Sequence, residues 1–207
     1  MVIVHHLNHS RSQRVLWFLE ELGTPYEIKH YARDLTTNLA PPELTAIHRL
    51  GKSPVIEDDG QIIIESGAIL EYLSAKYGNG RFSPPAGTPE AITHSQWMHY
   101  AEGSAMLPFL LRLYTSRLGD AAAPLMPRID GETMNHLSYI ESALANRDFF
   151  LGDQITAADF QMSFVAEIAH LGGATAQCPN IAGFVKRIQA REGYKRALEK
   201  GGEYRFA

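Results

Sequence analysis

The apolar positions of the first 80 residues alternate between spacings typical of strands and spacings typical of helices. Residues 2–7 form a short β-branched run, which favours a strand, whereas the apolar side chains of residues 15–22 recur at helical spacing. Asp59-Gly60 separates two further strand-like runs and is a strong signal for a β-hairpin. The pattern therefore predicts a strand at 2–7, a helix ending at Gly23, a strand at 26–31, a short helical piece at 43–50, strands at 54–57 and 61–64, and a helix opened by Glu65 and Ser66.

A polar segment rich in glycine and proline, residues 78–88, separates this half from a second half with only helical patterns. Thr88 is suited to cap the next helix, with Pro89 at its first position. Pro108 is expected to kink that helix, because proline lacks a backbone donor. The helices expected are about 89–118, 127–146, 156–171, 180–191 and 193–200. We therefore predict an α+β domain at residues 1–80, followed by an all-α helical domain at 88–207.

Composition narrows the class of protein. The chain has 207 residues, 45% of them hydrophobic and 20% charged, which is typical of a globular protein. A net charge of −4 gives no electrostatic reason to expect nucleic acid as a partner. The single cysteine, Cys178, excludes an intrachain disulfide and a CxxC pair. There is no signal-peptide pattern, and no apolar stretch approaches the ~20 residues that span a bilayer, so we expect a cytoplasmic protein without a membrane partner.

Three short segments carry candidate chemistry, and the first lies between the first strand and the first helix. Residues 8–14 read Asn-His-Ser-Arg-Ser-Gln-Arg. Hydroxyls and free amides at a helix N-terminus favour an anion. The alternative is that Ser10 or Ser12 only caps the helix.

The second segment is Lys52-Ser53-Pro54, at the start of a predicted strand. A cis Ser53-Pro54 bond would leave the backbone N–H and C=O of Ser53 pointing outward, ready to pair with an extended peptide. The alternative is an ordinary trans proline that marks the edge of the strand.

The third segment is Glu65-Ser66, directly after a strand. The hydroxyl and amide of Ser66 can bind a carboxylate, while Glu65 can bind an ammonium group. An amino-acid head group carries both charges on one carbon. The alternative is a helix start with an acid that suits the helix dipole.

Other features favour structural interpretations. His5, His6 and His9 do not have the spacing of metal ligands, so no metal site is expected. Thr156 and Asp159 resemble a capping box. A further group of side chains recurs at helical spacing and can belong to the core, to a pocket or to both. This group includes Met106, Phe109 and Tyr114.

Taken in order, these segments resemble the cytosolic glutathione transferase family, closest to the bacterial and fungal branch with S-R-S after the first strand. The resemblance covers nearly the whole chain. It rests on SRSQRVLWFLEELGTPYE (10–27), PPELTAIHRLGKSPVI (41–56), ESGAILEYL (65–73) and GDQITAADF (152–160). It implies a thioredoxin-like N-terminal domain of β-α-β-α-β-β-α order, an all-helical C-terminal domain and a homodimer.

The resemblance also implies roles for individual residues. Glu65 and Ser66 would hold the γ-glutamyl head of glutathione. Ser53, before a cis Pro54, would pair with the cysteinyl unit, and Lys52 would meet the glycyl carboxylate. For the contact to the thiol, the family position is occupied by His9. Ser10, one step later, is the preferred candidate, with Ser12 and His9 as alternatives.

The function implied is detoxification by a glutathione transferase that activates the glutathione thiol as a thiolate for attack on a small hydrophobic electrophile. Met106, Phe109 and Tyr114 are candidates for the apolar wall of the electrophile pocket. Glutathione would be the co-substrate, and no cofactor or metal is expected. The alternatives are a glutathione-dependent disulfide reductase or peroxidase, and a non-catalytic binding module on the same fold.

Overall fold

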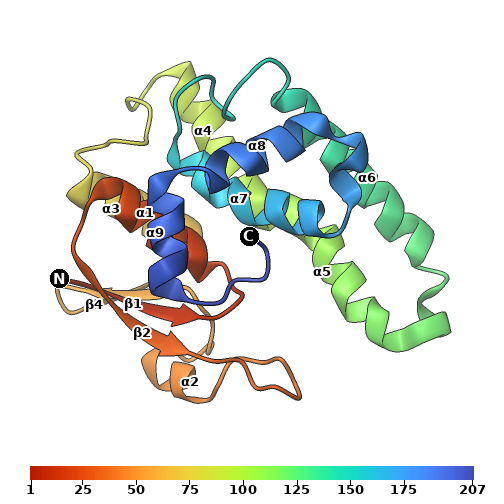
Figure 1. The fold of residues 1–207 in the computed structure, drawn as a ribbon, viewed down its shortest axis with the longest axis horizontal. Coiled ribbons are helices and arrows are strands. Elements are labelled where there is room, and N and C mark those ends of the chain that lie inside the picture. The colour runs from red at the N-terminus through yellow and green to blue at the C-terminus, as the bar shows by residue number, and fades with distance from the viewer.

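The computed structural model describes residues 1–207, except for the side chain of Ala174. The first half is a four-stranded sheet with helices, in the order expected from the sequence. Its elements are β1 (Val2–Leu7), α1 (Ser12–Leu22), β2 (Tyr26–Tyr31), α2 (Glu43–Ile47), β3 (Val55–Asp58), β4 (Gln61–Ile64) and α3 (Ser66–Tyr77). The second half is helical (Figure 1), so the predicted fold class is confirmed.

The sheet has the strand order β2-β1-β3-β4. β1 pairs with β2 in parallel and with β3 antiparallel, and β3 and β4 form the expected hairpin. Val2 and Val4 of the central strand are completely buried. Because β1 lies inside the sheet, the turn that follows it is held close to the start of β3.

The helices of the second half cover one side of the first half and extend to the right in Figure 1. They are α4 (Pro89–Tyr100), α5 (Met106–Thr115), α6 (Met126–Ala143), α7 (Ala157–Leu171), α8 (Pro179–Gln189) and α9 (Glu192–Gly201). Short 3₁₀ helices at Ser116–Ala122 and Ala174–Gln177 connect some of them. No helix in the part of the chain that the structure describes is long and apolar enough to cross a membrane.

The long helix expected at about 89–118 is divided in two. A π-helical segment, Ala101–Ala105, separates α4 from α5, and the N–H of Met106 bonds to the carbonyl of Ala101, five residues back. Pro108 follows shortly after and has no N–H for the carbonyl four residues before it. The break therefore lies just N-terminal to the proline, where the helical hydrogen-bond pattern adjusts.

α1 is buried on all sides, because the sheet covers one face and helices of the second half cover the other. Residues 12–20 are all buried. Trp17 and Phe18 pack against Phe160 of α7, with ring centroids 4.0 and 4.8 Å apart. α9 lies along α1 (Figure 1), and Arg191 next to it pairs with Glu21. The two halves therefore share one core around α1.

The capping box expected at the start of α7 is present. The carboxylate of Asp159 is completely buried and accepts bonds from the amides of Phe150 (2.8 Å) and Thr156 (2.7 Å) and from the Thr156 hydroxyl (2.9 Å). Asp159 therefore joins the start of α7 to the loop before it.

We predict that Asp159→Ala lowers the free energy of unfolding by about 3 kcal/mol, because three buried donors lose their acceptor. Urea denaturation followed by circular dichroism measures this change. Asp153→Ala is the matched control, since Asp153 is exposed and has no side-chain hydrogen bond among the described residues. A loss for Asp159→Ala no larger than the control's would contradict the structural role.

Candidate functional site

A groove of about 230 Å³ lies on the first half, next to the helical half. It brings together all five residues expected at a peptide-binding surface, although they come from separate segments. Its lining includes Lys52, Ser53, Pro54, Glu65 and Ser66 together with Arg11, His48, Leu50, Val55, Ile64 and Glu102. Cationic, anionic and apolar side chains all face this groove, so it suits a charged, peptide-like ligand.

The Ser53-Pro54 bond is cis, as one of the two interpretations of this segment required. The Ser53 hydroxyl donates to the carbonyl of His5 at 2.8 Å and accepts from the amide of Leu7 at 3.3 Å. These bonds fasten the loop to the end of β1. The backbone of Ser53 is left without a backbone partner among the described residues, so it can pair with an extended ligand.

Glu65 and Ser66 lie where β4 meets α3. Glu65 has φ 65° and ψ 115°, a backbone conformation that a residue with a side chain rarely adopts and that costs about 1–3 kcal/mol. Its side chain is exposed, whereas Ser66 is buried at the N-terminus of α3. Free amides at this helix start favour an anion, and the Glu65 carboxylate beside them favours a cation.

A cluster of charged side chains lies beside the groove and joins the two halves. Arg14 is buried, and its Nη1 donates to the Ser66 hydroxyl at 3.1 Å and to the Glu102 carboxylate at 2.9 Å. Arg11 donates through Nε to both oxygens of Glu102 at 2.8 Å. Burial acts to raise the pKa of Glu102, but the charges of Arg14 and Arg11 outweigh it and hold that pKa below its usual range. Glu102 is therefore a carboxylate that links the helical half to the groove.

The hydroxyls of the turn between β1 and α1 are directed inward. Ser10 donates to the carbonyl of Leu7 at 2.7 Å and lies 2.7 Å from the Ser12 hydroxyl. Ser12 is completely buried and lies 2.8 Å from Nδ1 of His6. Burial, with the charge of His30 adding to its effect, lowers the pKa of His6 to about 4. The neutral ring therefore completes an internal chain of hydrogen bonds.

The other histidines near this turn also have defined partners. His5 contacts Tyr31 (2.8 Å) and Glu57 (2.6 Å) across the sheet. His9 has φ 51°, and its Nδ1 accepts a bond from the backbone N–H of Arg205 at 3.2 Å. Across the described residues, no group of three or more His, Cys, Asp or Glu side chains is arranged to hold a metal ion.

The bond from Arg205 determines which nitrogen of His9 carries the proton. Because Nδ1 accepts, the neutral ring carries its hydrogen on Nε2. Partial burial lowers the pKa of His9, and the charge of Arg205 adds to this effect. At neutral pH the ring is therefore an uncharged donor through Nε2.

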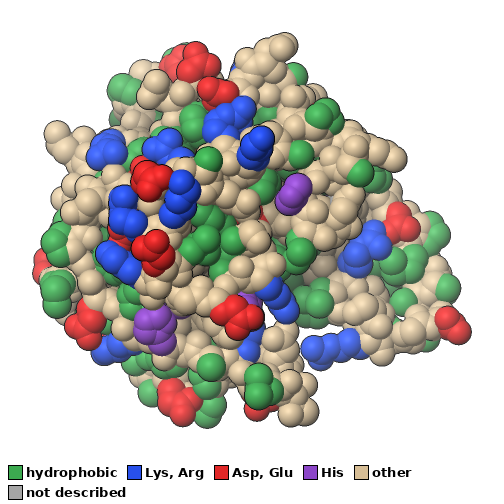
Figure 2. Space-filling view, viewed as in Figure 1, with side chains coloured by type: hydrophobic (Ala, Val, Ile, Leu, Met, Phe, Trp, Pro, Cys, Tyr) green, Lys and Arg blue, Asp and Glu red, His purple; other side chains and the backbone are tan. Residues whose placement is uncertain are grey.

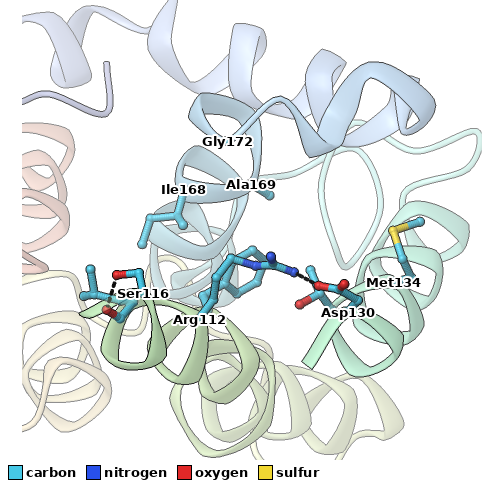
Figure 3. Close-up of a pocket in the computed structure, with 10 residues that line it drawn as sticks. Arg112, Ser116, Asp130, Met134, Ile168, Ala169 and Gly172 are labelled. Atoms are coloured by element: carbon cyan, nitrogen blue, oxygen red, sulfur yellow. Dashed lines mark hydrogen bonds and ion pairs between the residues drawn. The ribbon is translucent and has the colours of Figure 1, made fainter. Parts of the chain in front are cut away.

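An apolar cavity of about 660 Å³ lies between α5, α6 and α7 (Figure 3). Phe109 lines it, together with Leu113, Met134 and Ile168. Arg112 reaches across to Asp130, and this ion pair joins α5 to α6. Met106 is buried in the core, and Tyr114 is 62% exposed and does not line the cavity. Of the three expected pocket residues, the structure places Phe109 at this cavity.

Comparison with known proteins matches both halves to one family. Residues 1–75 match the glutathione S-transferase N-terminal domain, and residues 98–192 match the C-terminal domain. Glutathione S-transferase 3 of Schizosaccharomyces pombe is 40% identical over 178 residues, which are 79% of this chain and 72% of that protein. The chain belongs to the glutathione S-transferase family.

Further relatives extend the likeness over the whole length of this glutathione transferase. Glutathione S-transferase 1 of Saccharomyces cerevisiae is 30% identical, and the match covers 97% of this chain and 95% of that protein. The crystal structure of a glutathione S-transferase from Actinobacillus pleuropneumoniae is 31% identical with a TM-score of 0.90, covering 100% of this chain and 95% of that one.

Sequence reasoning missed Arg14 and Glu102. Arg11, directly before α1, and Arg14 within it are three residues apart, a spacing that brings side chains together and is a signal for a paired function. An arginine in a helix with so many apolar neighbours also requires an acidic partner. Nothing in the sequence identifies that partner as Glu102, which is 88 residues away from Arg14.

We predict that Glu102→Gln lowers the free energy of unfolding by about 2 kcal/mol at pH 7, because the buried Arg14 loses its counter-charge. Glu199→Gln makes the same change of net charge at an exposed position that is in no ion pair among the described residues, and it serves as control. Thermal and urea unfolding measure both variants.

The stabilisation should depend on pH in a defined direction. Since the folded-state pKa of Glu102 lies below its usual 4.5, its contribution is complete above about pH 4.5 and is lost as the pH falls toward the lower value. The difference between wild type and Glu102→Gln should therefore shrink in acid. A difference that is absent at pH 7, or that grows in acid, would contradict the assignment.

Proposed function

We propose that the groove binds glutathione along its length, and that this transferase activates the glutathione thiol as a thiolate for attack on a hydrophobic electrophile. The observation that carries the proposal is the arrangement of the groove. The lining contains Glu65 and Ser66, the cation of Lys52 and the free backbone of Ser53. Separate groups can thus read the two charged ends of one tripeptide.

The γ-glutamyl end is assigned to the start of α3. The amide and hydroxyl of Ser66 would bind its carboxylate, and Glu65 would bind its ammonium group. Arg14 supports this assignment, since it holds the Ser66 hydroxyl at 3.1 Å and fixes its direction. Lys52 is exposed and forms no ion pair among the described residues, so its charge is available to the glycyl carboxylate.

We assign the contact with the thiol to Nε2 of His9 and to the free amides of the turn, in preference to the hydroxyl of Ser10. The Ser10 hydrogen is donated to the carbonyl of Leu7, and Ser12 is completely buried. The backbone amides of Ser10 and Arg11 have no backbone acceptor among the described residues. One or two such donors can lower a thiol pKa from near 8.5 by about one or two units.

We propose that the helical half forms one side of the electrophile site. Of the residues expected there, Phe109 lines an apolar cavity in that half. The alternative activities are the reduction of disulfides or peroxides by glutathione. Cys178 is buried, so glutathione would supply every thiol in such a reaction. Assays with a chloronitrobenzene, a mixed disulfide and an organic peroxide distinguish these activities.

We further propose that the chain acts as a homodimer in the cytoplasm without a cofactor. The dimer is favoured by an exposed strip of small and apolar residues on α4 and the segment before it. Ile92 is 65% exposed there, and Ala86, Gly87 and Ala91 lie beside it. A second copy of the chain would cover this strip.

Glu65→Gln should weaken glutathione binding about tenfold, because the ammonium group loses its counter-charge at a partly solvated site. Turnover at saturation should change less, since this contact is the same before and during attack. Calorimetry measures the dissociation constant. Glu71→Gln, at an exposed position of the same helix, is the control. Unchanged affinity with a lower melting temperature would show that Glu65 only supports the helix.

His9→Gly should raise the kinetic pKa of bound glutathione by about one unit and lower turnover at neutral pH, because the thiolate loses a donor. Glycine accepts the φ of 51° without strain. The pH dependence of kcat measures the shift. Ser10→Ala should shift this kinetic pKa less than His9→Gly does. A larger shift for Ser10→Ala would assign the contact with the thiol to Ser10.

A further inference from the structure

The last six residues turn back over the loop between β1 and α1. The tail leaves α9 and ends near α7, as Figure 1 shows. The Tyr204 hydroxyl donates to the buried Glu167 at 2.6 Å, and Phe206 packs on Phe164 with centroids 5.1 Å apart. These contacts on either side of Arg205 fix it next to His9.

The guanidinium groups of Arg33 and Arg205 both act on His9, and neither forms an ion pair with an acid among the described residues. Arg33 donates to the carbonyl oxygens of Asn8 (3.1 Å), His9 (3.4 Å) and Asn38 (2.9 Å), and to no carboxylate in the described part of the chain. The side chain of Arg205 is exposed and forms no ion pair among the described residues. Basic, acidic and histidine side chains gather in Figure 2 where the tail passes in Figure 1.

One acid, Glu203, lies beside His9 at the surface of the molecule. The Glu203 carboxylate lies 3.9 Å from Nε2 of His9 and is 86% exposed. Burial lowers the pKa of Arg33, and the charges of Arg205 and Arg11 lower it further. The three cations therefore act on one another across the turn, and the surface around His9 attracts anions.

Two packed aromatic rings, the partly exposed Phe206 and the buried Phe164, lie between this surface and the groove. The guanidinium of Arg205 lies 5.0 Å from the ring centre of Phe206, which packs on Phe164, and Arg11 lies 4.9 Å from the ring centre of Phe164. Arg11 in turn lines the groove. Aromatic faces flanked by cations suit a flat ring that carries a negative charge.

We propose that the second substrate of this transferase is an aromatic electrophile that carries a carboxylate. Its ring packs on the partly exposed ring of Phe206, which the buried Phe164 supports from behind, and its anion is bound by Arg205, with Arg33 adding to the attraction. This inference rests on the proposed function, because it places the electrophile next to the thiolate at His9. A neutral electrophile would leave both guanidinium groups unpaired.

The test compares a chlorodinitrobenzoate with its methyl ester. In both reactions the glutathione sulfur bonds to the ring carbon, chloride leaves with the electron pair of the carbon–chlorine bond, and the thiol proton passes to solvent. The measured quantity is kcat/KM for the carboxylate divided by kcat/KM for the ester. Within one protein, the quotient cancels any change in thiolate formation, because both substrates react with the same thiolate. Comparing the quotient between wild type and variant cancels the difference in chemical reactivity between the two substrates.

Arg205→Gln should lower the quotient about fivefold, because a solvated guanidinium–carboxylate pair is lost. The substitution keeps the backbone N–H that bonds to His9. Arg147→Gln is the control, because it removes the same charge at another exposed position. An equal quotient for the two variants would overturn the proposal.

A binding measurement separates this proposal from the proposed function. Dinitrobenzoate without the chlorine, and its methyl ester, are titrated by calorimetry into protein saturated with S-methylglutathione. Tighter binding of the carboxylate, lost in Arg205→Gln and kept in Arg147→Gln, supports the anion site even if neither electrophile is conjugated. A different result separates the two proposals. If the ester is conjugated, but Arg205→Gln changes neither the quotient nor the relative binding of carboxylate and ester, the function stands and the anion site is refuted.

Discussion

The buried guanidinium of Arg14 is the constraint on which the site depends. It lies in a helix that is covered on both sides, where an unpaired charge would be costly. Glu102 supplies the counter-charge from the helical half, and Ser66 takes a further bond from the same guanidinium. One interaction therefore holds the two halves together and fixes the serine at the start of α3. A substitution of Arg14 is therefore expected to change both the stability of the fold and the position of Ser66.

The break between α4 and α5 serves the same interaction. Glu102 lies in the π-helical segment Ala101–Ala105, which inserts an extra residue into a turn of the long helix. Such segments occur often at functional sites, because they change the direction of the side chains that they carry. Pro108 has no N–H to donate, so a regular helix would lose a hydrogen bond near this point even without the π-helical segment. A local irregularity thus brings a carboxylate to the groove.

The sequence predicts those features of this chain that depend on local chemistry. The strand and helix order follows from periodicity, the hairpin from Asp59-Gly60, and the start of α7 from Thr156 and Asp159. Features set by distant residues could not be predicted. The burial of Ser12 against His6 depends on how β1 and α1 pack, and the contact between Arg205 and His9 joins residues 196 positions apart.

The tail shows why the chemistry of the turn cannot be assigned from the turn alone. Residues 8–14, the four residues of the turn and the first three of α1, offer two hydroxyls and one imidazole, and propensity favours a serine at the helix start. Packing reverses this preference, because the serines satisfy the interior of the turn while the ring of His9 remains partly accessible. The tail then selects the tautomer through Arg205 and surrounds the ring with positive charge. The uncharged ring offers its Nε2 hydrogen as a donor, and the nearby guanidinium groups of Arg205 and Arg33 favour an anion at this turn, while the exposed Glu203 carboxylate 3.9 Å from Nε2 opposes them.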